Sequence, residues 1–576
     1  MNLESLANEL LIDLFEFLSS AHLLHAFHGL NSRFDSLLLV HFHTHSLDFR
    51  SILKHDFLTI CQHLSVFANQ IPSLYLSDKD DTPGQVDQFY SHDFTLCHFT
   101  ALKSLSVYHL HSDDTMNKIL LDLPYLSNIT HLTFDECCFS YDETKALTFV
   151  NIIWSLPKLT HCYMKIQFKP QIYFPIPTVI SSTIEHLFIS DIEPQFNQMT
   201  RLLQTTPYLQ YLSIDFHFNF SEEYQSSIIT SINTLNVSFF SIDYNILVNF
   251  FKYTPNLCQL KVDLPDMYID GKTWEQIIQT YLPKLKQFQF RMNNESDNDD
   301  NDKEQQINEI LNLFRTSFWL NKYQLFVQCD WNSHSNNIFL YSLPYAFDNF
   351  YFQSPILSKS TYHYDNQQWS YNNVHRLTYK TGLSEWLTLS HIQFNKIREL
   401  CVYLPIDEYF WSIIPKLERL ILLDVLSNGE NENYDIQLQT LLDRAPHVSI
   451  LRLRNWSSTI SKILPIRKTN LSLLQLDLMW YKWYDHEECA MLSQLLLDIQ
   501  CNVLLIDVTN RKCILELVHT ISNLRALNVR CQDDKLDSST TLIDDELIKW
   551  LQQYLPPSST ITRDYYPVRC IRLWIR

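Results

Sequence analysis

Along most of the chain, one apolar residue is followed by a second three positions later and a third two positions after that. Triplets with this spacing begin at Leu102, Ile129, Leu159, Ile184, Leu209, Ile232, Leu257, Leu285, Ile397, Leu417, Val448, Leu473, Val503 and Leu524. Successive starts lie 20 to 31 residues apart, except across the gap from Leu285 to Ile397. Weaker copies begin at Ile71 and Val374. This period predicts an array of stacked repeats.

Within each repeat, the second and third apolar residues alternate with polar ones, which predicts a strand with one buried face. Helical patterns, such as residues 142–154, lie between the strands. A proline often stands two residues before the triplet, at Pro157, Pro207, Pro255, Pro283, Pro415 and Pro446. Proline ends a helix and favours extended backbone before a strand. We expect one continuous core lined by Leu105, Leu132, Leu187, Leu212, Leu260, Leu400, Leu420, Leu451, Leu476 and Leu527.

This pattern resembles leucine-rich repeats, and the resemblance implies an α/β solenoid of the horseshoe type. The family often carries Asn or Cys eight residues after the start of each triplet. Cys137 and Asn293 fit, whereas Leu110, Val425 and others do not. We therefore expect an irregular solenoid over residues 51–576, after a separate module at residues 1–50. The alternative is a set of separate α/β domains with similar local patterns.

The first 50 residues have a different pattern. Leu10, Leu11, Leu14, Phe15 and Leu18 recur at the spacing of one helical face, with Asn8 as a candidate N-cap. Ser20 and Asn31 are candidate caps of two further helices. Three short helices cannot bury this many Leu and Phe side chains among themselves. The surplus apolar face predicts a partner.

The same stretch resembles an F-box, the module of SCF-type cullin–RING ubiquitin ligases that binds the SKP-family adaptor. Leu6-Ala7-Asn8-Glu9-Leu10-Leu11 and Leu23-Leu24 match the family pattern, as does Leu30-Asn31-Ser32-Arg33-Phe34 for its closing segment; Ala7 replaces the usual proline. The resemblance implies adaptor contacts from Leu6, Leu10, Leu11, Leu14, Phe15, Leu18, Leu23, Leu24 and Phe27. The alternative is an ordinary amphipathic helix pair packed on its own domain.

Composition excludes several other classes of protein. With 5 glycines in 576 residues, the chain has no glycine-rich phosphate loop and no nucleophile elbow. A net charge of −20 disfavours a nucleic-acid partner. The 13 cysteines lack regular spacing, which favours a reduced intracellular protein, cytoplasmic or nuclear. We expect no signal peptide, because the N-terminus lacks Lys and Arg, and no membrane-spanning helix.

Four segments depart from the repeats. Residues 77–87 and the acidic stretch 293–306 are predicted loops, the second one disordered. Asp297, Asp299 and Asn301 imitate the start of an EF-hand, but Asp302 and Asn308 stand where Gly and Glu are needed. Residues 310–396 are predicted to form two to three degenerate repeats. A tail helix at 544–555 and a last strand at 568–575 are predicted to cap the open end of the array.

Candidate chemical sites are weak. His41, His43 and His45 could share one face of a strand as metal ligands, but no Cys or carboxylate follows at ligand spacing. Asp485-His486-Glu487-Glu488-Cys489 contains catalytic residue types at helical spacing, without evidence of a cleft. We therefore expect no metal, no cofactor and no catalysis. An enzyme within residues 310–396 is the remaining alternative.

These observations favour a substrate receptor, in which the F-box binds the adaptor, and through it a cullin, and the solenoid holds a target protein for ubiquitin-dependent degradation. The alternative is an interaction scaffold without a ubiquitination substrate. The outward strand residues become Arg-rich and aromatic near the C-terminal end. Arg452, Arg454, Trp480 and Trp483 are therefore the candidate target-binding residues, in contact with an acidic or aromatic segment. The alternative is that the tryptophans pack at the edge of the repeats.

Overall fold

The computed structural model describes residues 3–91, 94–192, 198–217, 231–240, 242–295, 303–331, 337–353, 357–362, 371–381, 392–427, 434–455, 472–480, 482–534, 545–564 and 569–576. The chain divides into two compact units. Unit 1 holds Met1–His217, Ser221–Ser227 and Ser558–Arg576, and unit 2 holds Phe218–Phe220 and Ile228–Pro557. None of the helices among these described residues is long and apolar enough to cross a membrane.

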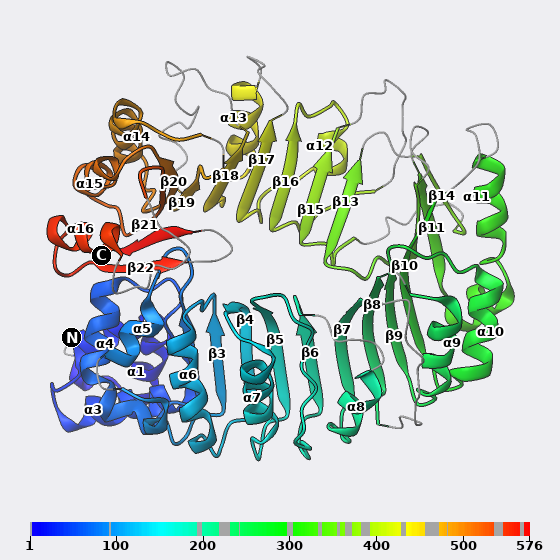
Figure 1. Cartoon of the computed structure of the whole chain (residues 1–576), viewed down its shortest axis with the longest axis horizontal. Helices are drawn as coiled ribbons and strands as arrows, with labels where there is room; N and C mark the ends of the chain where they lie inside the picture. The colour runs from blue at the N-terminus through cyan, green and yellow to red at the C-terminus, as the bar shows by residue number, and fades with distance from the viewer. Residues whose placement is uncertain are drawn as a thin grey trace. The chain divides into compact units, whose positions relative to one another are not determined.

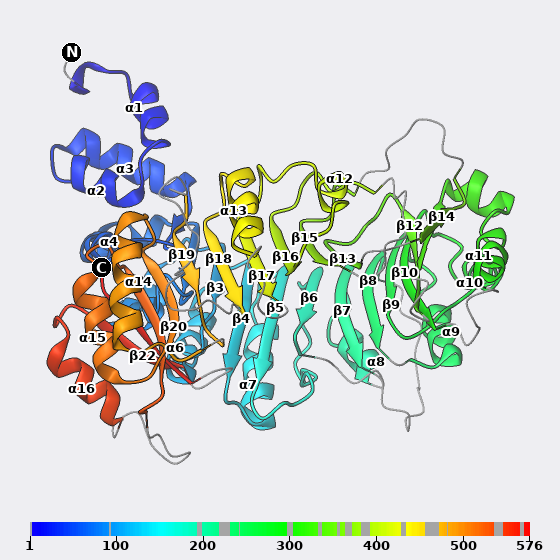
Figure 2. The ribbon, with the colours of Figure 1, turned by 90° about the horizontal axis from the view of Figure 1, so that it is seen from above.

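Unit 1 begins with short helices. They are η1 (Leu3–Ser5), α1 (Asn8–Phe15), α2 (Ser20–Phe27) and α3 (Ser32–Thr44), followed by α4 (Lys54–Phe67) and η2 (Ala68–Gln70). Asn31 caps α3 as predicted, by accepting hydrogen bonds from the N–H groups of Arg33 and Phe34. The other predicted caps are wrong by one residue, since Ala7 and Ser19 occupy the N-cap positions of α1 and α2. Figure 2 shows α1–α3 as a group at one edge of unit 1.

The repeats of unit 1 form a parallel sheet. Its strands, in sequence order, are β1 (Leu47–Asp48), β2 (Ser73–Ser77), β3 (Ser104–Tyr108), β4 (His131–Phe139), β5 (His161–Phe168), β6 (His186–Ser190) and β7 (Tyr211–His217). The connections carry α5 (Gln85–Ser91), η3 (Leu96–His98), α6 (Asp113–Asp122), η4 (Leu123–Tyr125), α7 (Glu143–Trp154) and α8 (Met199–Gln204). Helices α6–α8 lie on one side of the strands (Figure 1).

A C-terminal hairpin completes unit 1. Strands β22 (Thr560–Asp564) and β23 (Cys570–Trp574) pair antiparallel. Lys54 of α4 donates to the carbonyl oxygen of Trp574 over 2.9 Å, and the Phe57 and Trp574 rings lie 5.5 Å apart. The predicted last strand is therefore present, and its hairpin packs against the first repeats. Part of the predicted loop at 77–87 is buried there, and α5 begins at Gln85.

Unit 2 begins with parallel strands β8 (Thr234–Phe240), β9 (Gln259–Leu264) and β10 (Gln287–Glu295). The order then becomes antiparallel, through β12 (Asn337–Leu343), β11 (Phe326–Trp331) and β14 (Leu357–Ser360). Helices α9 (Tyr244–Lys252), α10 (Gly271–Tyr281), α11 (Lys303–Asn312) and the π-helix η6 (Phe318–Tyr323) accompany these strands. Buried Trp274 and Trp319 pack against Phe288.

A second parallel sheet occupies the rest of unit 2. Its strands, in order, are β13 (Asn349–Gln353), β15 (Arg376–Lys380), β16 (Glu399–Leu404), β17 (Leu422–Ser427), β18 (Ile450–Arg454), β19 (Gln475–Asp477), β20 (Val503–Val508) and β21 (Ala526–Cys531). The helices are α12 (Phe410–Ile413), α13 (Tyr434–Arg444), α14 (His486–Asp498), α15 (Arg511–Thr520) and α16 (Glu546–Tyr554).

The α/β repeat prediction is confirmed in outline, since parallel strands alternate with helices in both units. Every leucine predicted to line the core is at most 1% exposed. Two triplets were placed in the wrong register. The pairing of Leu400 with Leu423, and of Leu504 with Leu527, moves the triplet starts from Leu417 to Leu420 and from Val503 to Cys501.

The prediction of a single continuous core is wrong in one respect. Strands β11, β12 and β14 break the parallel order inside unit 2, so residues 310–396 hold an antiparallel insertion as well as the repeats of β13 and β15. Strand β10 extends to Glu295 and α11 begins at Lys303, which shortens the predicted acidic loop at both ends. Its EF-hand-like positions 297–302 lie outside the described residues.

Candidate functional site

Helix α1 presents an exposed apolar row. Leu10, Leu14 and Phe17 are 55%, 39% and 87% exposed. Their spacing of four and three residues places them on one side of α1 and the turn that follows it. Large apolar side chains so exposed, and adjacent, are typical of a surface that binds a partner.

Other residues in the predicted adaptor-binding set have a different position. Leu6 and Leu18 are half-buried, whereas Leu11, Phe15, Leu23, Leu24 and Phe27 are buried within the chain. The Phe15 ring lies 4.9 Å from Phe27 and 6.0 Å from His41. The implied adaptor contact from Phe15 is therefore wrong, because Phe27 of α2 and His41 of α3 already cover its ring.

Helix α4 covers part of the apolar surface that α1, α2 and α3 would expose if they stood alone. The Phe67 ring lies 5.1 Å from Phe42 of α3 and 5.3 Å from His28 in the turn after α2. The predicted module at residues 1–50 is thus packed on the next helix of unit 1.

Arg33 holds the start of α1 against α3. Its guanidinium donates to Asn8 Oδ1 over 2.9 Å and to the carbonyl oxygens of Glu4 and Leu6. Ala7, the residue in place of the family's proline, has φ −62°. Proline fixes φ near this value, so the backbone at Ala7 already has the conformation that proline favours.

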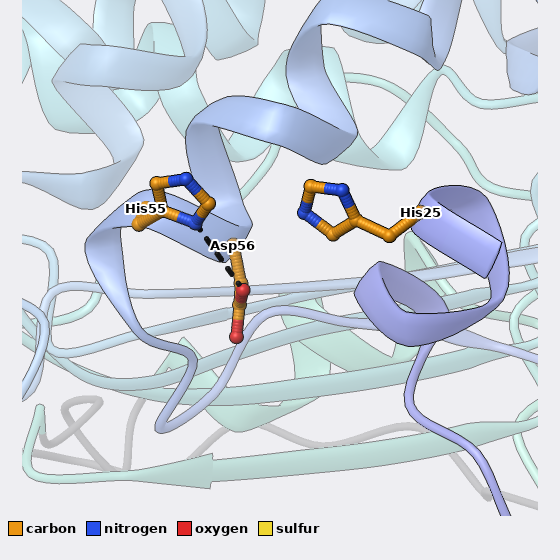
Figure 3. Close-up of side chains that lie close together, drawn as sticks. All are labelled: His25, His55 and Asp56. Atoms are coloured by element: carbon orange, nitrogen blue, oxygen red, sulfur yellow. Dashed lines mark ion pairs between the residues drawn. The ribbon is translucent and has the colours of Figure 1, made fainter.

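Histidines gather between α2 and α4. Figure 3 shows His25 of α2 facing His55 and Asp56 of α4, and the ligand atoms lie within 4.8 Å of one another. The two imidazoles stack at 5.8 Å, and both histidines are exposed. Three ligands are one fewer than a closed zinc site uses, and free rotation of exposed side chains brings such groups together without an ion.

The predicted histidine strand at residues 41–45 is wrong, because His41 and His43 lie in α3 and His45 follows its last turn. His41 is buried and stacks on His45 at 4.1 Å. Burial, with a contribution from His45, lowers the pKa of His41 to about 4. A neutral, stacked imidazole here supports packing.

Arg452 and Arg454 project from β18 on the face opposite the buried leucines. Arg452 Nε lies 3.6 Å from Asp477 Oδ2, and Arg454 Nε lies 3.3 Å from Asp424 Oδ1. Both side chains are about one-third exposed. The aspartates balance the two positive charges, so these two arginines present no net positive charge.

Trp480 and Trp483 are 53% and 39% exposed, so the tryptophans are not simply buried edge packing. The Arg530 guanidinium lies 3.9 Å from the Trp480 ring centroid and 5.1 Å from that of Trp483. Asp507 accepts hydrogen bonds from Arg530 and from the N–H of Trp480. Arg530 was missed by the sequence analysis, although it follows Val529 at an outward strand position.

Asp477 connects the arginines with the tryptophans. Its Oδ2 pairs with Arg452, and its Oδ1 accepts a hydrogen bond from the N–H of Met479, the residue before Trp480. The turn carrying the tryptophans therefore starts at the carboxylate that neutralises Arg452. We name Arg452, Arg454, Trp480, Trp483 and Arg530 the C-terminal patch.

The acidic segment at residues 485–489 forms a helix cap. Asp485 Oδ1 accepts from the N–H of Glu488 over 2.9 Å, and Glu488 Oε2 accepts from the N–H of Asp485 over 3.2 Å. Cys489 is buried in α14. Asp485 and Glu488 thus form a capping box at the start of α14, and the helical spacing of the segment is confirmed.

No protein-family model matches the sequence, and a search of curated proteins gave no match. Among solved structures, the chain matches an internalin from Listeria monocytogenes at 8% identity. The match covers 84% of this chain and 94% of the internalin, with a TM-score of 0.17.

Proposed function

We propose that the chain is a non-catalytic substrate receptor of an SCF-type ubiquitin ligase. Its N-terminal helices bind the SKP-family adaptor, and its repeats hold a target protein. The exposed row of Leu10, Leu14 and Phe17 is the observation that carries the proposal. Adaptor, cullin and the other ligase subunits supply the ubiquitin chemistry.

The row has the spacing by which a helix inserts into a hydrophobic groove of a partner. Burial of each such side chain contributes about 1.5–3 kcal/mol. The buried set beneath the row, including Phe15 and Phe27, holds α1 in position. Of the predicted adaptor contacts, Leu10 and Leu14 therefore act directly, joined by Phe17.

Co-purification from cells tests the proposal. The full chain with Leu10→Asp and Leu14→Asp should lose the adaptor, while the wild-type chain retains it. Leu121→Asp on α6 is the matched control, because Leu121 is equally apolar and more exposed. Adaptor retained by the double variant would refute the F-box assignment.

An interaction scaffold without a ubiquitination substrate is the second candidate. It shares the exposed row, so adaptor binding does not separate the two. Proximity labelling with the Leu10→Asp, Leu14→Asp chain identifies the bound proteins. Under the receptor proposal at least one of them accumulates relative to wild type, whereas under the scaffold proposal their levels stay unchanged.

A further inference from the structure

A pocket of about 530 Å³ opens on one sheet face of unit 2, within the volume range of about 300–1,000 Å³ that ligand sites occupy. Arg291 and Asn293 of β10 stand opposite Tyr341 and Phe339 of β12, and Phe339 stands opposite Asp330 of β11. Opposed residues point to the same face. Phe290 and Met292 alternate with Arg291 and Asn293 along β10, and they contact Phe314 and Trp274 on the helical side of the sheet. The pocket therefore lies on the face away from the helices.

The positive charge in the pocket is already balanced. Arg291 donates to both carboxylate oxygens of Asp263, with 2.9 Å between Nε and Oδ1. It also donates to the Tyr345 hydroxyl and to Asn349 Oδ1, each over 3.1 Å. The Asp263–Arg291 pair thus leaves no net charge to attract an anion.

The remaining acidic side chain, Asp330, has no such partner among the residues that the structure describes, and burial raises its pKa, which a neighbouring cation would lower again. Asp330 is 2% exposed and accepts hydrogen bonds only from neutral groups in the described part of the chain. These donors are Tyr341 Oη at 2.6 Å, Ser358 Oγ at 2.7 Å and Gln328 Nε2 at 3.1 Å. No cation pairs with it among the described residues. A carboxylate offers about four acceptor sites, so one is left for a ligand.

The walls suit a flat cation. Trp331, Phe339, Tyr341, Tyr345, Phe350 and Tyr351 line the pocket. Aromatic faces attract a cation, and the attraction is strongest when the cation is desolvated. The buried Oδ1 of Asn293 accepts no hydrogen bond in the described part of the chain, which leaves an acceptor for a further N–H group.

We propose that this pocket binds an arginine side chain presented by the target protein, between the aromatic walls and Asp330. The inference rests on the proposed function, since it names a contact through which the receptor holds its target. Guanidinium stacks on aromatic rings and offers several N–H donors, whereas an ammonium is a compact point charge. Phe339 and Tyr351 line the pocket and are 40% and 50% exposed, so they offer apolar surface to the residues that flank the arginine in a peptide, which free arginine lacks.

Titration of the full chain with acetyl-Leu-Arg-Leu-amide, followed by ligand-observed NMR, tests the proposal. The same peptide with citrulline in place of arginine keeps the shape and removes the charge. We expect the arginine peptide to bind at least about tenfold more tightly than the citrulline peptide and than free arginine. Asp330→Asn should remove about tenfold of that affinity. Asp407→Asn is the control and should change nothing, because Asp407 also accepts a hydrogen bond from a tyrosine hydroxyl in unit 2 but lies outside the pocket.

Tyr351→Ala, at the exposed rim, keeps the test decisive if Asp330→Asn fails to fold; it should weaken the arginine peptide severalfold. Equal binding of the arginine and citrulline peptides, or wild-type affinity in Asp330→Asn, overturns the proposal. So does free arginine binding as tightly as the peptide, because the ligand would then be a small molecule. Adaptor co-purification should be unchanged in Asp330→Asn, so failure of the pocket and failure of the F-box assignment are separate results.

Discussion

Leu14 and Phe15 are neighbours in the sequence, yet one faces outward and the other is enclosed. The apolar spacing of α1 identified both, but five apolar residues cover more than one helical face. Which of them is exposed depends on α2 and α3, which come from elsewhere in the chain. The sequence could therefore predict the helices and the presence of an apolar surplus, but not which side chains form the exposed row.

Phe15→Ala should destabilise unit 1 by about 3–5 kcal/mol, because it leaves a cavity against Phe27 and His41. Leu14→Ala should change stability by less than about 0.5 kcal/mol, since the side chain is on the surface. Chemical denaturation of both variants measures the difference. Similar losses for the two would contradict the assignment of Phe15 to the core.

Ala7→Pro should stabilise the fold by about 0.4–1 kcal/mol, because it restricts the unfolded chain at a position whose φ already suits proline. The Ala7 N–H donates to no acceptor in the described part of the chain, so no hydrogen bond is lost. The same denaturation measurement checks it, and a loss of stability would show that the backbone at Ala7 differs from that described here.

At the scale of elements, the local patterns predicted most strands and failed where pairing is distant. The triplets near Leu417 and Val503 contain additional apolar residues at neighbouring positions, so two registers satisfy the spacing, and only the adjacent strand decides between them. Strand β12 pairs antiparallel with β10, although α11, η6 and β11 lie between them in the chain, so this pairing cannot be predicted from local spacing.

Asp78 lies beside the C-terminal hairpin, where Arg572 donates a hydrogen bond to its backbone carbonyl oxygen. Burial, with a contribution from Asp87, raises the pKa of Asp78 to about 8. The fold thus favours the protonated carboxyl, and this stabilisation is lost as the pH rises from about 4 towards 8. Asp78→Asn keeps an acceptor for the N–H of Val86 and removes the titration. Its Tm should fall less than that of wild type between pH 5 and pH 8; an unchanged pH profile would contradict the burial of Asp78.

A histidine ladder crosses the outward face of unit 1. The rings of His131, His161 and His186 stack at 4.2 Å spacing. Burial, then the two neighbours, lowers the pKa of His161. Because the unfolded chain then binds the proton more strongly, stability should decrease as the pH falls below about 6.5. In an NMR titration the pKa of the His161 imidazole should lie below the usual histidine value of about 6.5, and a pKa at or above that value would contradict the stacking.

For the whole molecule, the repeat period was the signal that the sequence carried best, because strand alternation and helix spacing recur many times. The repeat period could not predict the pocket around Asp330. The residues that line this pocket come from the segments β9 through β13, and the antiparallel insertion brings them together. The C-terminal patch was partly foreseen. The sequence predicted that its arginines and tryptophans face outward, and they are partly exposed. The balancing aspartates and Arg530 lie on other strands or turns, so their place in the patch could be found only from the strand order.

Arg452→Glu with Arg454→Glu tests the C-terminal patch. Each glutamate would face Asp424 or Asp477, so target capture should fall while adaptor binding stays unchanged. Because the glutamates would face the largely buried Asp424 and Asp477 side chains, stability should fall as well, and thermal denaturation checks that the variant is folded under the conditions of the capture assay. Capture assays with the target from proximity labelling measure the effect, and equal capture by the variant would exclude the patch.

The most direct test of the receptor account is calorimetric titration of the purified full chain with a purified SKP-family adaptor. We expect wild type and Leu121→Asp to bind with the same affinity. The chain with Leu14→Asp and Phe17→Asp should bind the adaptor at least about a hundredfold more weakly, because two apolar contacts with the adaptor become charged. Its Tm should be unchanged. Absence of binding by wild type, or equal binding by the Leu14→Asp, Phe17→Asp chain, would contradict the account.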